Sequence, residues 1–220
     1  MKELHIITPV KDSIDSTLQT IRAVLDSHID VPFTYTVYND FSTAENTARL
    51  VQAAKDMGFR LVNLSDLTSH PSPNYLLVLQ TAQREALVAD AALCIVESDV
   101  VVQPRTLQSL YDGALQRNDC GIAASVTVDD EGCINYPYLY ARGKEDQVID
   151  VKKHCSFCCS LLTPALMATY SFEQLNPEKN WFDVTISHES LNHGFHNYLF
   201  TTLPVIHRPH PVSYTHLTLP

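Results

Sequence analysis

The chain has 220 residues, and its 15 lysine and arginine residues against 25 aspartate and glutamate residues give a formal net charge of −10. Its hydrophobic fraction of 45% supplies a full core and excludes a disordered chain. The acidity argues against a nucleic-acid-binding protein, because such proteins neutralise phosphates with basic side chains. Acidic side chains are instead compatible with a site for a divalent cation.

The length predicts a single domain over residues 1–210. Residues 211–220 follow the last expected strand without a helical pattern, and we expect them to be a tail that resembles a translated cloning scar. Residues 1–11 lack the features of a signal peptide, and no apolar run is long enough to span a bilayer. Together with six cysteines in mostly apolar surroundings, these features predict a cytoplasmic location and free, buried thiols.

The first half of the chain alternates predicted strands and helices. Short apolar runs rich in β-branched residues predict strands at 4–10, 33–38, 59–64 and 93–96. Amphipathic patterns with capping residues predict helices at 14–25, 45–57, 75–89 and 104–118, the last with Pro104 at its first position. This alternation predicts an α/β fold with a mostly parallel central sheet between two layers of helices.

The second half has a different pattern. Apolar and aromatic runs predict strands at 121–128, 133–141, 156–162, 195–203 and 205–207. Two short helices are expected at 164–170 and 184–193. No internal repeat or linker divides the chain, which favours one three-layer domain.

The segment Glu97-Ser98-Asp99 directly follows a predicted buried strand. Ligands of open α/β sheets bind outside the carboxyl ends of the strands. There, the two acidic residues can offer oxygen ligands to Mn²⁺ or Mg²⁺, which neutralises a diphosphate leaving group. A solvated strand end that caps the next helix explains the same residues equally well.

Two further pairs of residues end the first two strands of the predicted sheet, Thr8-Pro9 and Asn39-Asp40. In a doubly wound sheet these strand ends face the same crevice. Asp40 can then bond the base or ribose of a nucleotide, and Thr8 can line that site. Ordinary helix capping is the competing explanation.

Two residues near the end of the chain are candidates for chemistry. Asp183 begins a predicted helix, where it can act as a general base, and His207 ends a late strand, where it can complete a metal site. A plain helix cap and a surface histidine are the alternatives.

The cysteine pattern argues against a zinc site. Cys155 and Cys158 form one C-x-x-C pair, but no second pair follows at a suitable spacing, so we expect buried thiols in a strand. The sequence also lacks G-x-G-x-x-G, the P-loop and G-x-S-x-G, which argues against nicotinamide dehydrogenases, P-loop NTPases and α/β-hydrolases.

In their order and spacing, these motifs resemble a family 2 glycosyltransferase with the GT-A fold, over about residues 3–207. Residues 37–43 (VYNDFST) resemble the family's V-x-D-D-x-S-T element, which holds the nucleotide base, and residues 97–99 resemble its D-x-D metal element. Residues 183–194 match the spacing of the block that carries the general base of inverting members. His207 falls where the family has a metal-binding histidine.

The resemblance implies a metal-dependent, inverting hexosyltransferase that moves a sugar from a nucleotide-diphosphate sugar to a hydroxyl of a glycan or glycolipid. It implies a role in polysaccharide or glycolipid synthesis, and it is compatible with peripheral membrane association. By the same resemblance Asp183 is the catalytic base, and the metal ligands are Glu97, Asp99 and His207. The implied nucleotide contacts are Thr8, Pro9, Asn39, Asp40 and Ser98.

The chain departs from the family pattern at four places. Asn39 and Glu97 replace aspartates, Phe182 replaces the glutamate before the base, and Glu189 stands in the place of an arginine. These departures leave a second hypothesis open. The chain can be a degenerate GT-A module that binds a nucleotide sugar or a protein partner without turnover.

Overall fold

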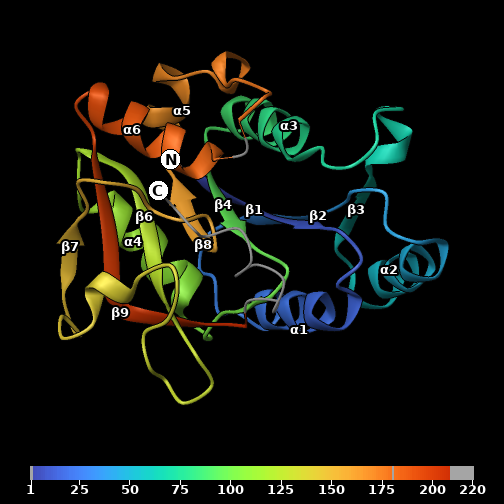
Figure 1. The fold of residues 1–220 in the computed structure, drawn as a ribbon, viewed down its shortest axis with the longest axis horizontal. Helices are drawn as coiled ribbons and strands as arrows, with labels where there is room; N and C mark the ends of the chain where they lie inside the picture. The colour runs from blue at the N-terminus through green and yellow to red at the C-terminus, as the bar shows by residue number, and fades with distance from the viewer. Residues whose placement is uncertain (1, 180, 209–220) are drawn as a thin grey trace.

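The computed structural model describes residues 2–179 and 181–208, so the predicted tail at 211–220 lies outside the described residues. Within them, nine strands form one sheet (Figure 1). The strands are β1 (Glu3–Val10), β2 (Phe33–Asn39), β3 (Arg60–Asn63), β4 (Ala91–Val96), β5 (Val100–Val101), β6 (Cys120–Val128), β7 (Val148–Asp150), β8 (Cys159–Leu162) and β9 (His196–His207). The α-helices are α1 (Ile14–Leu25), α2 (Ala44–Met57), α3 (Tyr75–Val88), α4 (Thr106–Leu115), α5 (Pro164–Thr169) and α6 (Phe182–Asn192).

The first half of the chain builds the parallel part of the sheet. β3, β2, β1 and β4 lie side by side in that order, and their pairings are all parallel. The helices α1, α2 and α3 make the crossovers between successive strands, as the alternation predicts. The carboxyl ends of these strands therefore meet at one edge of the sheet.

The prediction of a mostly parallel sheet is wrong, because the second half of the chain makes the sheet mixed. β8 lies between β4 and β6 and runs antiparallel to both, and β5 and β7 each run antiparallel to β9. Only β6 and β9 pair in parallel in this half of the described chain. Antiparallel neighbours need no helical crossover, so the strand–helix alternation of the first half contains no information about them.

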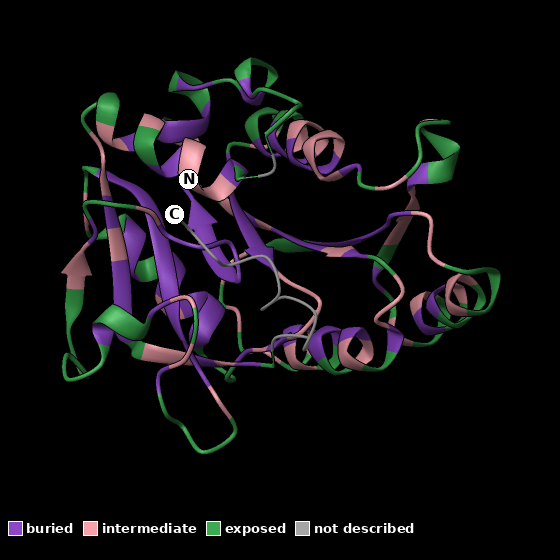
Figure 2. Cartoon of the chain, viewed as in Figure 1, coloured by how far each residue is buried: buried purple, intermediate pink, exposed green. Residues whose placement is uncertain are grey.

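The helices cover the two faces of the sheet, and a core lies under each layer. Buried residues of α3, α5 and α6 form one core with one face of the strands, and those of α1, α2 and α4 form the other. Figure 2 shows the buried strands between the two helical layers. Among the described residues, no helix combines the length and hydropathy needed to cross a membrane.

The predicted strand at 133–141 is wrong. Only Ile134 forms a β-bridge, with Val128, and a single 3₁₀ turn follows at Leu139–Ala141. Pro137 interrupts the run, because proline has no N–H group to donate to a strand ladder.

Several other predicted boundaries shift. α4 begins at Thr106 rather than at Pro104, and α6 begins at Phe182, two residues earlier than predicted. β9 continues through Pro204 as one strand instead of two. This continuous strand is important for the site, because it reaches the turn that follows β4.

Candidate functional site

A cleft of about 390 Å³ lies at the carboxyl-terminal edge of the parallel strands. Five residues that the sequence proposes as site residues line it: Pro9, Asp40, Glu97, Ser98 and Asp99. They come from the ends of β1, β2 and β4, the strand ends that the sequence placed at one crevice. Lys11, Ser72 and Tyr75 also line the cleft.

Strand pairing brings His207 to the acidic turn after β4. The turn passes directly into β5, where Val100 lies opposite His207 of β9 in an antiparallel ladder. As a result, His207 Nε2 lies 3.7 Å from a carboxylate oxygen of Asp99. The backbone N–H of Arg208 also donates to the Asp99 carbonyl at 3.2 Å, which fixes the turn against the end of β9.

His207 is one of three residues whose ligand atoms lie within 4.8 Å of one another, the others being Glu97 and Cys158. The His207 side chain is buried, and its Nδ1 lies 3.0 Å from the carbonyl oxygen of Tyr136. Because that carbonyl can only accept, Nδ1 carries the hydrogen and Nε2 presents its lone pair to the cluster. This is the arrangement in which a histidine ligates a metal.

Burial and the negative charges of Asp99 and Asp183 together raise the pKa of Glu97 to about 7, against the opposing effect of a hydrogen bond with Cys158. The Glu97 backbone N–H donates to the Cys158 carbonyl at 2.9 Å, so the acidic turn and the start of β8 are held together. A carboxyl group with this pKa is protonated in about half of the molecules at neutral pH unless a cation compensates its charge. The site therefore favours a positive ligand.

Asp183 lies in the first turn of α6, near the same cluster. Burial raises the pKa of its carboxyl group, which also accepts a hydrogen bond from the Val184 N–H at 2.8 Å. α6 packs very closely on β6 at Gly121. A Cβ atom at that position would lie only 2.1 Å from Ser190 Oγ of the helix. This close packing fixes the helix that carries Asp183.

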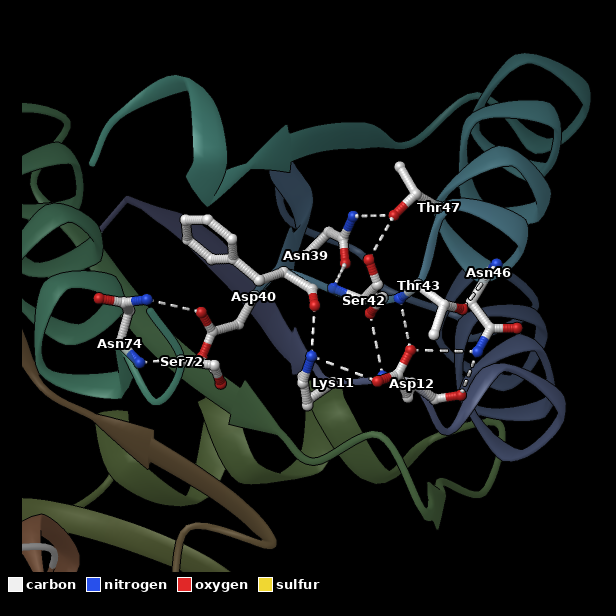
Figure 3. A network of polar contacts seen from close by, with 11 residues as sticks. Lys11, Asp12, Asn39, Asp40, Ser42, Thr43, Asn46, Thr47, Ser72 and Asn74 are labelled. Atoms are coloured by element: carbon white, nitrogen blue, oxygen red, sulfur yellow. Dashed lines mark hydrogen bonds and ion pairs between the residues drawn. The ribbon is translucent and has the colours of Figure 1, made fainter. Parts of the chain in front are cut away.

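Asp40 lies in the cleft wall, and its carboxylate is already well bonded. It accepts hydrogen bonds from Ser72 Oγ at 2.7 Å, from the Asn74 N–H at 2.8 Å and from Asn74 Nδ2 at 2.8 Å (Figure 3). These bonds hold the segment before α3 against the end of β2. Carboxylate oxygens accept more than one hydrogen bond each, so Asp40 retains capacity for a ligand.

Thr8 and Asn39 do not line the cleft. Thr8 Oγ1 lies 2.9 Å from the Tyr35 hydroxyl, and both side chains are buried in the layer under α1, α2 and α4. The Asn39 amide nitrogen donates to Thr47 Oγ1 at 3.0 Å (Figure 3). It also donates to Asn63 Oδ1 at 2.9 Å. The polar groups of both residues therefore bond other residues of the protein and stabilise the strands next to the cleft.

A polar network that the sequence analysis missed ties the first two strand ends together (Figure 3). Asp12 accepts hydrogen bonds from the Thr43 N–H at 2.6 Å and from Asn46 Nδ2 at 3.2 Å, and its own N–H donates to Ser42 Oγ at 2.9 Å. The Thr43 N–H bond lowers the pKa of the Asp12 carboxyl group. Lys11 donates to the carbonyl of Phe41 and brings a positive charge to the cleft.

Tyr75, the first residue of α3, was also missed. Its hydroxyl group is buried and has no hydrogen-bond partner in the structure. Burial raises the pKa of Tyr75, and the nearby charges of Glu97 and Asp183 raise it further. Buried hydroxyl groups are nearly always hydrogen-bonded, so this one marks a position where a ligand can supply the partner.

No protein-family model matches the sequence, and no curated protein matches it at the sequence level. The fold, in contrast, occurs in solved glycosyltransferases. Residues 1–349 of TarS from S. aureus match with a TM-score of 0.68 and 13% identity, over 93% of this chain and 60% of that one. A mannosyltransferase from Pyrobaculum calidifontis, in complex with GDP-Man and Mn²⁺, matches with a TM-score of 0.62 and 12% identity, over 92% and 56%.

A further TarS structure, in complex with UDP-GlcNAc, matches with a TM-score of 0.65 and 13% identity, over 94% of this chain and 59% of that one. The chain therefore has the GT-A glycosyltransferase fold, as its motif order indicates. It spans about 60% or less of the length of these neighbours.

We expect the metal-free protein to lose stability, through Glu97, as the pH rises from about 4.5 to about 7. In that window the folded state holds a proton that the unfolded chain has released, so a rise in pH favours unfolding. The difference between pKa values of 4.5 and about 7 sets an upper limit of roughly 3–4 kcal/mol.

Urea unfolding of the wild type and Glu97→Gln across this pH range measures the effect. His5, whose pKa is lowered by burial, contributes in the opposite direction but equally in both proteins, so their difference isolates Glu97. The free-energy difference should change with pH in that window. Parallel curves would show that Glu97 has an ordinary pKa.

Proposed function

We propose that the chain is a family 2 glycosyltransferase that moves a sugar from a nucleoside-diphosphate sugar to an acceptor hydroxyl with inversion. The observation that carries the proposal is that Glu97, Asp99, Asp183 and His207 gather at the carboxyl-terminal edge of a GT-A sheet. The binding of GDP-Man and UDP-GlcNAc by proteins of the same fold supports this class of donor. The acceptor would be a glycan or glycolipid.

The residues present fit a divalent cation. Glu97 and Asp99 offer carboxylate oxygens, and His207 offers a free Nε2 because the Tyr136 carbonyl occupies its Nδ1. A bound cation would neutralise the charge that develops on a departing diphosphate. The Mn²⁺ ion in the mannosyltransferase complex supports the proposal that this site binds a divalent cation.

Asp183 would be the general base. Its raised pKa makes the carboxylate a better proton acceptor, and the packing of α6 on β6 holds it in place. It would take the proton of the acceptor hydroxyl while that oxygen bonds the anomeric carbon and the bond to the diphosphate breaks. Attack from the face opposite the leaving group inverts the configuration.

Nucleotide binding would use the cleft wall. Pro9, Asp40 and Ser98 line the cleft and can contact the nucleotide directly, and Lys11 brings a positive charge to it. Thr8 and Asn39 would act indirectly, because their polar groups bond the protein interior.

A second candidate function is nucleotide-sugar binding without turnover. Glu189, which stands in the place of an arginine, does not line the cleft, and its carboxylate lies 3.8 Å from His193 Nε2. This observation favours a module that has kept the fold but lost a contact used in catalysis.

We expect Asp183→Asn to abolish transfer while nucleotide binding stays within about threefold of the wild type, because the amide cannot accept the proton. A screen of nucleotide sugars for hydrolysis, with and without Mn²⁺, first identifies the donor. Transfer is then measured by release of the free nucleoside diphosphate, and binding by calorimetry.

Glu189→Gln is the matched control on the same helix, and it should retain activity. Transfer by Asp183→Asn at the wild-type rate would refute the base assignment. Donor binding without hydrolysis or transfer by the wild type would favour the second candidate function.

We expect Tyr75→Phe to keep or slightly raise the stability, by up to about 1 kcal/mol, since it removes a buried hydroxyl without a partner. If the hydroxyl donates to the bound diphosphate sugar, the variant should bind the donor roughly 10-fold to 100-fold more weakly, the cost of a hydrogen bond to a charged group. Thermal unfolding and calorimetric titration measure the two effects. A destabilised variant with unchanged donor affinity would show a purely structural role.

A further inference from the structure

Cys158 lies in the cation cluster. Its sulfur is 4.0 Å from His207 Nε2 and belongs, with a Glu97 carboxylate oxygen, to the group of ligand atoms that lie within 4.8 Å of one another. The residue is buried and precedes β8, the strand that runs antiparallel between β4 and β6. The pairing of β8 with β4 places this sulfur beside the acidic turn.

We propose that Cys158 is a ligand of the cation site and makes the site selective for a thiophilic ion of the zinc type over Mn²⁺ or Mg²⁺. The location of the site rests on the proposed function, but the coordination does not depend on sugar transfer. As the sulfur–metal bond forms, the thiol proton passes to solvent, so the bound form is a thiolate.

The set of donor atoms supports this selectivity. Glu97, His207 and Cys158 offer one carboxylate, one imidazole and one sulfur within 4.8 Å of one another, and three protein ligands with an open fourth position are typical of a catalytic zinc site. Asp99 adds a second carboxylate, 3.7 Å from His207 Nε2. Mg²⁺ and Mn²⁺ prefer oxygen ligands, whereas sulfur selects softer ions.

The distances also fit. In a tetrahedral zinc site, bond lengths of about 2.0–2.3 Å place neighbouring ligand atoms roughly 3.3–3.6 Å apart. The corresponding distances here are 3.7 Å from His207 Nε2 to Asp99 and 4.0 Å from His207 Nε2 to Cys158. A contraction of a few tenths of an ångström would close this part of the site around an ion.

Neighbouring groups hold the two ligands in orientation. Tyr136 accepts from His207 Nδ1, and the Ser156 hydroxyl lies 3.3 Å from the Cys158 sulfur, where it can donate to a thiolate. Such outer contacts are typical of metal sites and orient the ligands before the ion binds. The competing explanation is that Cys158 is a buried thiol that donates a hydrogen bond to Glu97 and binds no metal.

Cobalt(II) distinguishes these explanations, because a cobalt–thiolate bond gives an intense near-ultraviolet charge-transfer absorption. We expect the wild-type protein to show this absorption on titration with Co²⁺, and Cys158→Ser to lose it. Calorimetry should show at least about 100-fold weaker Zn²⁺ binding by the variant, which is the upper range for loss of an outer contact alone. Mn²⁺ affinity should change by less than about threefold.

Cys155→Ser is the matched control, because Cys155 is a buried thiol of the same segment outside the cluster. It should retain the absorption. Absence of the absorption in the wild type would overturn the proposal even if Cys158→Ser failed to fold, and so would an equal loss of Zn²⁺ and Mn²⁺ affinity. Cobalt–thiolate absorption in a protein that transfers no sugar would support the site and reject only the transferase.

Discussion

The antiparallel pairing of β5 with β9 is the constraint on which the candidate site depends. It places His207 beside Asp99, next to a turn that already contains Glu97. Burial and the charges of Asp99 and Asp183 make the ionised form of Glu97 costly, which is why its pKa reaches about 7. The fold thus concentrates negative charge in a place where a cation would relieve the repulsion.

In the rest of the cleft, some polar side chains are fixed by hydrogen bonds within the protein, and others have no partner there. Asp12 joins the ends of β1 and β2, and Asp40 joins the end of β2 to the segment before α3. Against this fixed wall, the Tyr75 hydroxyl remains without a partner and His207 Nε2 faces the cation cluster. Preorganised groups of this kind lower the cost of binding, since the protein does not have to order them for the ligand.

Local patterns predicted much of the fold, and long-range pairing explains what they missed. Capping residues and apolar runs predicted the elements from β1 to β4, because those signals lie within each element; in α2 the structure places the caps at Thr43 and Gly58. The insertion of β8 between β4 and β6 leaves no local signal, so the sheet was predicted to be mostly parallel. For the same reason Cys158, read as a plain buried thiol, was not expected beside His207. Thr8 and Asn39 were placed at the correct strand ends, but end position does not tell which way a side chain points.

The central claim is that a cation and a nucleoside diphosphate bind together in this cleft. Calorimetric titration of UDP and GDP with and without Mn²⁺ or Zn²⁺, in the wild type and in Asp99→Ala, tests it most directly. The account predicts that a cation tightens binding of at least one nucleotide by about tenfold or more, equivalent to about 1.4 kcal/mol, and that Asp99→Ala removes this dependence. Nucleotide binding that is indifferent to the cation, or absent in the wild type under both conditions, would contradict it.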